Sequence, residues 1–348
     1  MSMEQVIALA EIAVVCLLFG SIYVPIKRFR PGDGFFSQFM MSLGIFAVGF
    51  GIFAATGFGR FFPLAMVGGV LIGVGNLVAI PIIQELGLAL AILLFNVTSC
   101  VVNYAVGTFG LFGTRARRPA VFWLSLVGML LVVVGGVLIS FVKTKPSELM
   151  AELERLSPNR ASAVLPSLVP STDDCSLERG EAKPKTNCLK NFRKGIALVF
   201  ALIAGTLYGV VQVPIIAIED NPALYPDAPK DGLHFCFSLY CGLFLVSSAS
   251  FLVYAGVKKN SPSINPSVAL PSFCSGLMWA AGMCLTIVCT QHLSQAVAGP
   301  ITSMVPGCVA TLWSVHYFRE VPMGRNLLLL WGGIAVTVGG AVCIGVSR

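Results

Sequence analysis

Charged residues are scarce in this sequence. Asp, Glu, Lys and Arg make up only 11% of its 348 residues, whereas apolar residues make up 56%. A water-soluble domain usually carries about 25% charged residues, which cover its surface. Lipid can replace water around the outer face of a protein, and it requires no charged side chains there. The composition therefore argues against a soluble protein and indicates an integral membrane protein with several spans.

The sequence also lacks the motifs of several chemistries. No Cys-x-x-Cys or Cys/His spacing indicates a metal site. No Ser/His/Asp, His-Glu-x-x-His or phosphate-loop pattern supports an enzyme. We therefore predict no enzymatic activity, no metal and no cofactor. The net charge of +7 does not indicate nucleic acid, because the basic residues cluster beside apolar runs, as in loops that flank a bilayer.

Apolar runs of the length needed to cross a bilayer, about 20 residues, recur along the chain. The first has no basic segment before it, so it is expected to stay as a membrane helix and not to be cleaved as a signal peptide. The ten predicted spans are 6–26, 35–56, 62–83, 86–108, 120–142, 195–218, 233–256, 268–290, 295–317 and 326–346. The predicted fold class is an all-α integral membrane protein.

Residues 143–194 interrupt this series of spans. They are rich in Pro, Ser, Lys, Arg and Glu, and they cannot bury enough apolar surface to fold alone. We predict a polar, largely disordered connecting loop here. It divides the chain into a first five-helix repeat, 1–142, and a second five-helix repeat, 195–348.

The two halves carry similar strings, which predict an internal duplication. Gly20-x-x-x-Val24-Pro25-Ile26 ends the first span, and Gly209-x-x-x-Val213-Pro214-Ile215 ends the sixth. Pro63 opens the third span with Gly68 five residues later, as Pro271 opens the eighth with Gly276. Gly128 and Val134-Gly135-Gly136 match Gly332 and Val338-Gly339-Gly340. Small residues recur by chance in membrane helices, but three matches in one order carry more weight.

An odd number of spans in each half determines how the second half enters the membrane. It must enter from the opposite side, which makes the repeats inverted. Inverted repeats are typical of secondary transporters, with a site near the midplane between the halves.

Prolines occupy matching places in the first and sixth spans. Pro25 and Pro214 each remove a backbone donor. They could be hinges of discontinuous helices, or they could simply terminate each helix at the interface, and the duplication favours the hinge. Pro81, Pro300 and Pro306 are expected to add similar breaks in the third and ninth spans.

Polar side chains inside the spans are the candidates for binding a solute. They are Asn76, Asn96 and Asn103, Tyr208 and Gln212, and Trp279. Amides both donate and accept hydrogen bonds, and aromatic faces cover the C–H surfaces of sugars. The set therefore predicts a polar cavity for a polyhydroxylated solute. Any one of these residues could instead bond to another helix, which contributes only about 0.6 kcal/mol on average.

Two charged residues have two readings each. Glu11 is an acid well inside an apolar run, which makes it a candidate proton site, but it could also lie at the interface. Lys27 follows the first Pro motif and could bind an anionic or hydroxylated solute at the mouth of a cavity. It could equally anchor the helix by snorkelling to the interface.

Strings in nearly every span carry a family resemblance. In the first half they are Phe19-Gly20-Ser21, Val24-Pro25-Ile26-Lys27, Gly32-Asp33-Gly34 with Gln38, Gly75-Asn76, Ile80-Pro81-Ile82-Ile83 and Phe109-Gly110-Leu111-Phe112-Gly113. In the second half they are Leu207-Tyr208-Gly209, Val213-Pro214-Ile215-Ile216, Ala269-Leu270-Pro271, Ser275-Gly276 with Trp279, and Phe318-Arg319-Glu320. Together they resemble the transmembrane protein 144 family, carbohydrate transporters of the drug/metabolite transporter superfamily.

The resemblance implies a ten-helix inverted-repeat fold and transport of a sugar or a similar solute. Gln38, which lies in one of these strings, joins the candidate substrate-binding residues. The sequence departs from the family pattern at Val210, where a Ser is expected, so a polar contact there is in doubt. Glu11 matches no family motif, which weakens its reading as a proton site.

The leading hypothesis is a multi-pass membrane transporter, monomeric or homodimeric, that moves a carbohydrate by alternating access. One alternative is a carrier of nucleotide sugars or other anionic metabolites. Another is a non-transporting sensor or scaffold, for which a closed interior is expected. The positive-inside rule places the 143–194 loop, with ten of the 23 Lys and Arg residues, in the cytosol. The family resemblance favours cytosolic termini, so the orientation is left open.

Overall fold

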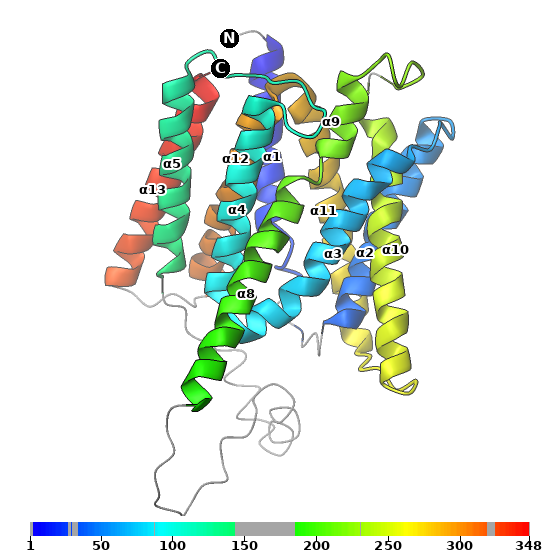
Figure 1. The fold of residues 1–348 in the computed structure, drawn as a ribbon, viewed down its shortest axis with the longest axis vertical. Coiled ribbons are helices and arrows are strands. Elements are labelled where there is room, and N and C mark those ends of the chain that lie inside the picture. Colours follow the sequence, from blue (N-terminus) through cyan, green and yellow to red (C-terminus); the bar gives the residue numbers. More distant parts are fainter. Residues whose placement is uncertain are drawn as a thin grey trace, which may run out of the picture.

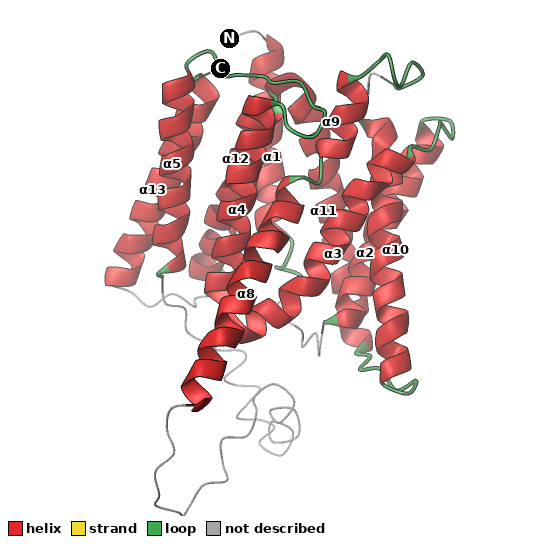
Figure 2. Cartoon of the chain, in the orientation of Figure 1, coloured by secondary structure: helices red, strands yellow, loops and turns green. Residues whose placement is uncertain are grey.

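The computed structural model describes residues 3–26, 29, 34–86, 88–142, 185–229, 231–318 and 324–347. Within these ranges the chain is helical and contains no strand (Figure 2). Its helices are α1 Met3–Ser21, α2 Phe35–Ala55, α3 Pro63–Leu86, α4 Leu88–Phe109, α5 Phe122–Ser140, α8 Lys185–Gly209, α9 Val213–Asp220, α10 Leu233–Val257, α11 Pro266–Leu293, α12 Gln295–His316 and α13 Arg325–Val346.

The described helices have the length and composition of membrane spans. Eight candidate spans are long and apolar enough to cross a bilayer, and α8 with α9 counts as one of them. Two shorter apolar stretches, Ala10–Ser21 and Pro63–Ala79, belong to α1 and α3. Outward-facing side chains on these helices are apolar: Leu252 is 70% exposed and Leu328 is 79% exposed. Such a surface is suited to lipid.

The helices run in alternating directions along the long axis of the molecule (Figure 1). α1 begins at the upper end of the view and α13 finishes at the same end, whereas α8 begins at the lower end. The most extensive contacts join helices from opposite ends of the sequence. α5 packs against α13, α2 against α10 and α11, α3 against α8 and α10, α4 against α8 and α12, and α1 against α11 and α12. The core therefore lies between the first five helices and the later ones.

Glycines allow α3 and α10 to approach each other closely. A Cβ added at Gly69 of α3 would overlap the carbonyl oxygen of Leu239 in α10. A Cβ added at Gly242 of α10 would overlap the carbonyl oxygen of Met66 in α3. Each glycine thus faces the carbonyl of the residue three positions before the other glycine. Small residues at such crossings let helix backbones touch.

The α2–α11 crossing repeats the same arrangement. A Cβ added at Gly44 of α2 would overlap the carbonyl oxygen of Phe273 in α11. A Cβ added at Gly276 of α11 would overlap the carbonyl oxygen of Met41 in α2. The blocking carbonyl again belongs to the residue three positions before the partner glycine.

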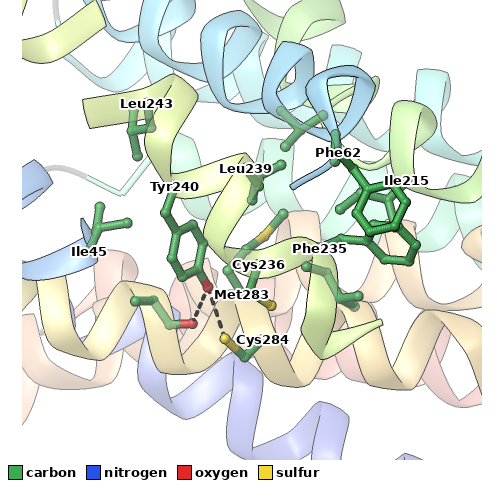
Figure 3. Close-up of a cluster of buried hydrophobic side chains, with 14 of the residues drawn as sticks. Ile45, Phe62, Ile215, Phe235, Cys236, Leu239, Tyr240, Leu243, Met283 and Cys284 are labelled. Atoms are coloured by element: carbon green, nitrogen blue, oxygen red, sulfur yellow. Dashed lines mark hydrogen bonds between the residues drawn. The ribbon is translucent and has the colours of Figure 1, made fainter. Parts of the chain in front are cut away.

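A buried cluster joins α10, α11 and the neighbouring helices (Figure 3). Tyr240 of α10 is fully buried, and its hydroxyl donates to the carbonyl oxygen of Ala280 at 2.7 Å and lies 3.0 Å from the Cys284 sulfur. Both partners belong to α11. Trp279 packs against the other side of this cluster, with its ring 6.0 Å from that of Tyr240. The phenol is therefore satisfied inside an apolar environment.

The two matching prolines have different places in the structure. The predicted span 195–218 is interrupted after Gly209, and Pro214 lies in the first turn of α9. It therefore opens a helix and does not end one. A Pro is well suited to this place, because the backbone N–H that it lacks would have no helical partner in the first turn. Pro25 lies beyond Ser21, where α1 ends. A role for either residue as a hinge stays a prediction.

The breaks expected at the other prolines are absent. α3 continues past Pro81, and α12 runs from Gln295 to His316 with Pro300 and Pro306 inside it. Pro271 does not open its span either, because α11 begins at Pro266. A membrane helix tolerates a Pro because one missing bond leaves the rest of the ladder intact and neighbouring groups satisfy the freed carbonyl.

The predicted loop 143–194 is also shorter than expected. α8 begins at Lys185, so residues 185–194 are helical. The apolar part of α8 provides a formed helix, and adding residues to it costs less than starting a new one. The remaining loop residues, 143–184, lie outside the described part of the chain.

Candidate functional site

The interruption between α8 and α9 leaves backbone groups without helical partners inside the protein. The carbonyl oxygen of Gly209 accepts a hydrogen bond from Gln295 Nε2 at 3.3 Å. The same nitrogen donates to Asn103 Oδ1 at 2.8 Å. Gln295 begins α12 and is only 4% exposed. It thus connects α12 to α4 and to the end of α8, as expected where a broken helix is buried in protein.

Asn103 extends this network across two helices. Its Nδ2 donates to the hydroxyl of Ser99, one turn earlier in α4, at 3.3 Å. It also donates to the hydroxyl of Ser303 in α12 at 3.4 Å. Asn96 lies on the same helix and is half-buried, but no hydrogen bond joins it to this network in the described part of the chain. The structure therefore brings Asn103 to the site and leaves Asn96 beside it.

Tyr208 and Asn76 form a second polar contact on the other side of α8. The Tyr208 hydroxyl donates to Asn76 Oδ1 of α3 at 2.9 Å. The tyrosine ring lies against Gly75 and makes an edge contact with Phe95, with ring centroids 5.9 Å apart. The two predicted residues therefore satisfy each other in this conformation.

We expect Tyr208→Phe to lower the free energy of unfolding by about 1 kcal/mol, the usual net contribution of one hydrogen bond. The ring would still fill the space beside Gly75. Thermal unfolding of the purified protein in detergent measures the loss. Asn76→Ala should cost less in the Tyr208→Phe background than alone. Additive losses would contradict the hydrogen bond.

Gln212 lies at the interruption itself, directly before α9. Its Oε1 accepts a hydrogen bond from the Thr290 hydroxyl of α11 at 3.0 Å. The same hydroxyl lies 2.7 Å from the carbonyl oxygen of Thr286 in its own helix. This contact joins the α8–α9 break to α11.

Two neighbouring acids end α9 and have different partners. Glu219 Oε1 accepts a hydrogen bond from Gln291 Nε2 at 2.6 Å. Asp220 is 5% exposed and accepts from the backbone N–H of Arg115 at 2.8 Å. Arg117 Nη2 lies 2.9 Å from the other oxygen of Asp220 and forms an ion pair with it. The loop between α4 and α5 is therefore attached to the end of α9.

Two small pockets meet beside these acids. They share Ile216, Glu219 and Thr290. Each is narrow and admits about one water molecule. The first is further lined by Gly107, Thr114, Arg115, Arg117 and Gln295, and the second by Gln212, Ile215 and Ile287. Of the predicted residues that the structure describes, only Gln212 lines either pocket.

Other predicted site residues lie apart from the pockets. Gln38 Nε2 of α2 donates to the hydroxyl of Ser247 in α10 at 3.5 Å. Trp279 stacks on Phe19 of α1, with ring centroids 6.4 Å apart. These residues join helices of the two halves, and they do not meet Gln212.

The two predicted charged sites are also separate. Glu11 Oε2 of α1 lies 3.4 Å from the sulfur of Cys289 in α11. Lys27 lies outside the described residues. A role for Glu11 as a proton site stays a prediction.

The sequence reasoning missed Glu219, Asp220, Gln295 and Arg117. Glu219 and Asp220 lie just beyond the predicted sixth span and were treated as part of a loop. One signal could have revealed the ion pair: with alternating spans, the acids and Arg117 belong to loops on the same side of the membrane.

Apolar helices of bilayer length, with polar groups gathered between them, define a multi-pass integral membrane protein. Residues 6–348 match the transmembrane protein 144 family, a transmembrane family of transporters, and the chain belongs to this family. The resemblance inferred from the sequence is thereby confirmed.

Relatives cover nearly the whole chain. A transmembrane protein 144 homolog from Caenorhabditis elegans is 38% identical over 346 residues, which is 99% of this chain and all of the relative. Homolog A from Dictyostelium discoideum is 29% identical and covers 96% of each chain. A protein of known crystal structure is similar with a TM-score of 0.56 over 97% of this chain and 95% of its own, at 16% identity. That last likeness concerns the fold alone.

Proposed function

We propose that this protein is a secondary transporter or facilitator that moves a carbohydrate by alternating access between two inverted five-helix repeats. It belongs to a family of transporters. The observation that carries the proposal is that the most extensive helix contacts correspond when the two halves are exchanged: α2–α11 corresponds to α3–α10, α1–α11 to α3–α8, and α1–α12 to α4–α8. Halves related in this way have two equivalent arrangements, each open to a different side.

The directions of the helices support the inversion. α1 and α8, the first helix of each half, begin at opposite ends of the molecule (Figure 1). Gly20 near the end of α1 lies against the side chain of Val309 in α12. Gly209 at the end of α8 lies against the side chain of Val102 in α4. Gly20 and Gly209 are the residues that the matching strings pair.

The aromatic residues directly before these two glycines also make contacts that correspond when the two halves are exchanged. Phe19 of α1 packs its ring against Gly282 of α11, and Tyr208 of α8 packs its ring against Gly75 of α3. The two contacts are equivalent, but one ring is apolar and the other carries a hydroxyl. These contacts support a shared backbone arrangement in the two halves with a difference in polarity, which suits a site that recognises a polar solute on one side.

The α5–α13 crossing supports the repeat and changes its register. Gly128 lies against the carbonyl oxygen of Gly340, and Gly333 lies against that of Gly135. Exchanging the halves converts one contact into the other only if Gly128 corresponds to Gly333. The string comparison paired Gly128 with Gly332, so the contacts favour a correspondence shifted by one residue.

The polar groups between the halves support a carbohydrate as the solute. Asn76, Asn103 and Gln212 present amides, which can both donate to and accept from hydroxyl groups. In the closed conformation these amides bond to protein groups. We propose that rocking of one half against the other, about Pro25 and Pro214 as hinges, exchanges these bonds for bonds to the solute.

A liposome experiment tests the proposed function. Purified protein is expected to exchange radiolabelled neutral hexoses across the bilayer, while empty liposomes do not. Asn76→Ala or Gln212→Ala should lower the initial rate of exchange several-fold without lowering expression, because each removes an amide that we propose bonds to the solute. Wild-type protein that exchanges no member of a broad sugar panel would contradict the carbohydrate assignment.

Two other functions are favoured by particular observations. Arg115 and Arg117 line the first pocket, which suits an anionic metabolite such as a nucleotide sugar. Inhibition of hexose uptake by nucleotides, relieved by Lys27→Ala, would favour that carrier. The closed interior suits a sensor or scaffold, which would exchange no solute in the same assay.

A further inference from the structure

We propose that the pocket between α9, the α4–α5 loop and the start of α12, which admits about one water molecule in this conformation, widens during transport and binds a neutral polyhydroxylated solute through Gln295 and Glu219. This inference rests on the proposed transport function and deepens it. It adds the end of α9 to the binding surface proposed above, apart from the contact between Asn76 and Tyr208. It also chooses between a neutral and an anionic solute.

Gln295 offers an acceptor that the protein does not use. Its Nε2 donates to the Gly209 carbonyl, which can only accept, so the amide orientation is determined. Its Oε1 is buried and has no hydrogen-bond partner among the described residues. Gln295 lines the first pocket. Buried polar atoms are nearly always satisfied, so an unpaired acceptor beside a pocket indicates a ligand that donates a hydrogen bond.

Glu219 supplies a second acceptor from another helix. Its carboxylate has about four acceptor positions, and Gln291 occupies one of them. In the described part of the chain Glu219 forms no ion pair, whereas its neighbour Asp220 is bound by Arg117 and by the backbone of Arg115. Glu219 lines both pockets. Two acceptors on facing helices suit a solute with several hydroxyl groups.

The charges around the pocket favour a neutral solute. Two basic residues line the pocket, Arg115 and Arg117, and they are balanced by Glu219 in the lining and by Asp220, which pairs with Arg117, so the formal charges cancel. Asp231 lies near enough to Glu219 to add a further negative charge. An anionic solute would thus gain no net attraction here, and it would have to approach an unpaired carboxylate.

The binding of tritiated neutral hexoses tests the site. The probe is an equimolar mixture of glucose, galactose and mannose, and a scintillation proximity assay measures its binding to the purified full-length protein. Glu219→Gln and Gln295→Met should each raise Kd about tenfold or more, because the one acceptor oxygen left at position 219 is taken by Gln291 and none is left at position 295. Thr302→Val is the matched control on α12: its hydroxyl bonds to the Ala298 carbonyl of its own helix, so its Kd should equal that of the wild type.

A third variant keeps the test decisive if Gln295→Met does not fold. Ile216→Trp fills the space that both pockets share and removes none of the side chains that form hydrogen bonds there, so hexose binding should be lost. Unchanged Kd in Glu219→Gln and Ile216→Trp, with hexose exchange intact in liposomes, would overturn the site and leave the transport function standing. Hexose 6-phosphates that compete as well as hexoses would overturn the neutral solute. Wild type that neither binds nor exchanges hexoses would overturn both proposals.

Discussion

Gly69→Leu should leave no stable folded protein, and Gly69→Ala should lower the melting temperature strongly. A Cβ at this position would overlap the backbone of Leu239, which is the carbonyl oxygen of a helix and not a side chain that can turn away. Overpacking a tight interior typically costs about 1–3 kcal/mol and sometimes more. Here a larger side chain would have to separate α3 from α10 along their contact. Size-exclusion chromatography and thermal unfolding in detergent measure both effects.

The arrangement of glycines provides both a replicate and a control. Gly242→Leu should have the same effect as Gly69→Leu, because the two glycines form opposite sides of one crossing. Gly51→Ala is the control, since a Cβ there meets nothing within 4 Å. If Gly69→Leu elutes and melts like the wild type, the close α3–α10 crossing is wrong. If only Gly242→Leu is tolerated, the two sides of the crossing are not equivalent.

Asp220→Ala should cost about 2 kcal/mol of stability and greatly reduce transport. Removing one member of a buried ion pair typically costs about 3–5 kcal/mol, and we expect less here because the Arg117 side chain is 43% exposed. The substitution also removes the acceptor of the Arg115 N–H. Without these bonds the α4–α5 loop should separate from α9. Thermal unfolding measures the loss of stability, and hydrogen exchange of residues 110–121 measures the separation of the loop.

Asp227→Ala is the matched control for the Asp220 experiment. Asp227 pairs with Arg60 at 2.7 Å, but the two side chains are 73% and 66% exposed. Exposed pairs contribute about 0–1 kcal/mol, so little change is expected. In a double-mutant cycle, Arg117→Gln should cost less in the Asp220→Asn background than alone. Hydrogen exchange of residues 110–121 that is faster than in the wild type in Asp227→Ala would contradict the attachment of this loop through Asp220. So would hydrogen exchange in Asp220→Ala that is no faster than in the wild type.

Span positions were predictable because each depends on residues close together in the chain. The predicted segment 35–56 agrees with α2, Phe35–Ala55, and 295–317 agrees with α12, Gln295–His316. The breaks predicted at prolines were wrong, because the rule that a proline breaks a helix was applied to helices packed inside the protein. Pro306 lies inside an unbroken helix, since neighbouring groups compensate for the lost bond. The predicted boundary between residues 194 and 195 was wrong, because the helix extends beyond the apolar run and begins at Lys185.

The candidate site was only partly predictable. Tyr208 and Asn76 were both selected as polar residues within spans, but nothing in their spacing indicates that one bonds to the other. Gln295 was overlooked because it begins a span, where a polar side chain usually faces water. Its burial depends on the interruption after Gly209, more than eighty residues earlier in the chain.

The sequence by itself determined that this is a membrane protein, which segments span the bilayer, and which family the protein belongs to. Composition and the length of the apolar runs are sufficient for the first two, because the bilayer acts on each helix separately, and the family follows from the resemblance of the short strings. Only the tertiary structure decided which polar groups meet. Gln295, Glu219 and Arg117 come together through contacts between helices far apart in the chain, and the free energy of such contacts depends on geometry that no local pattern specifies.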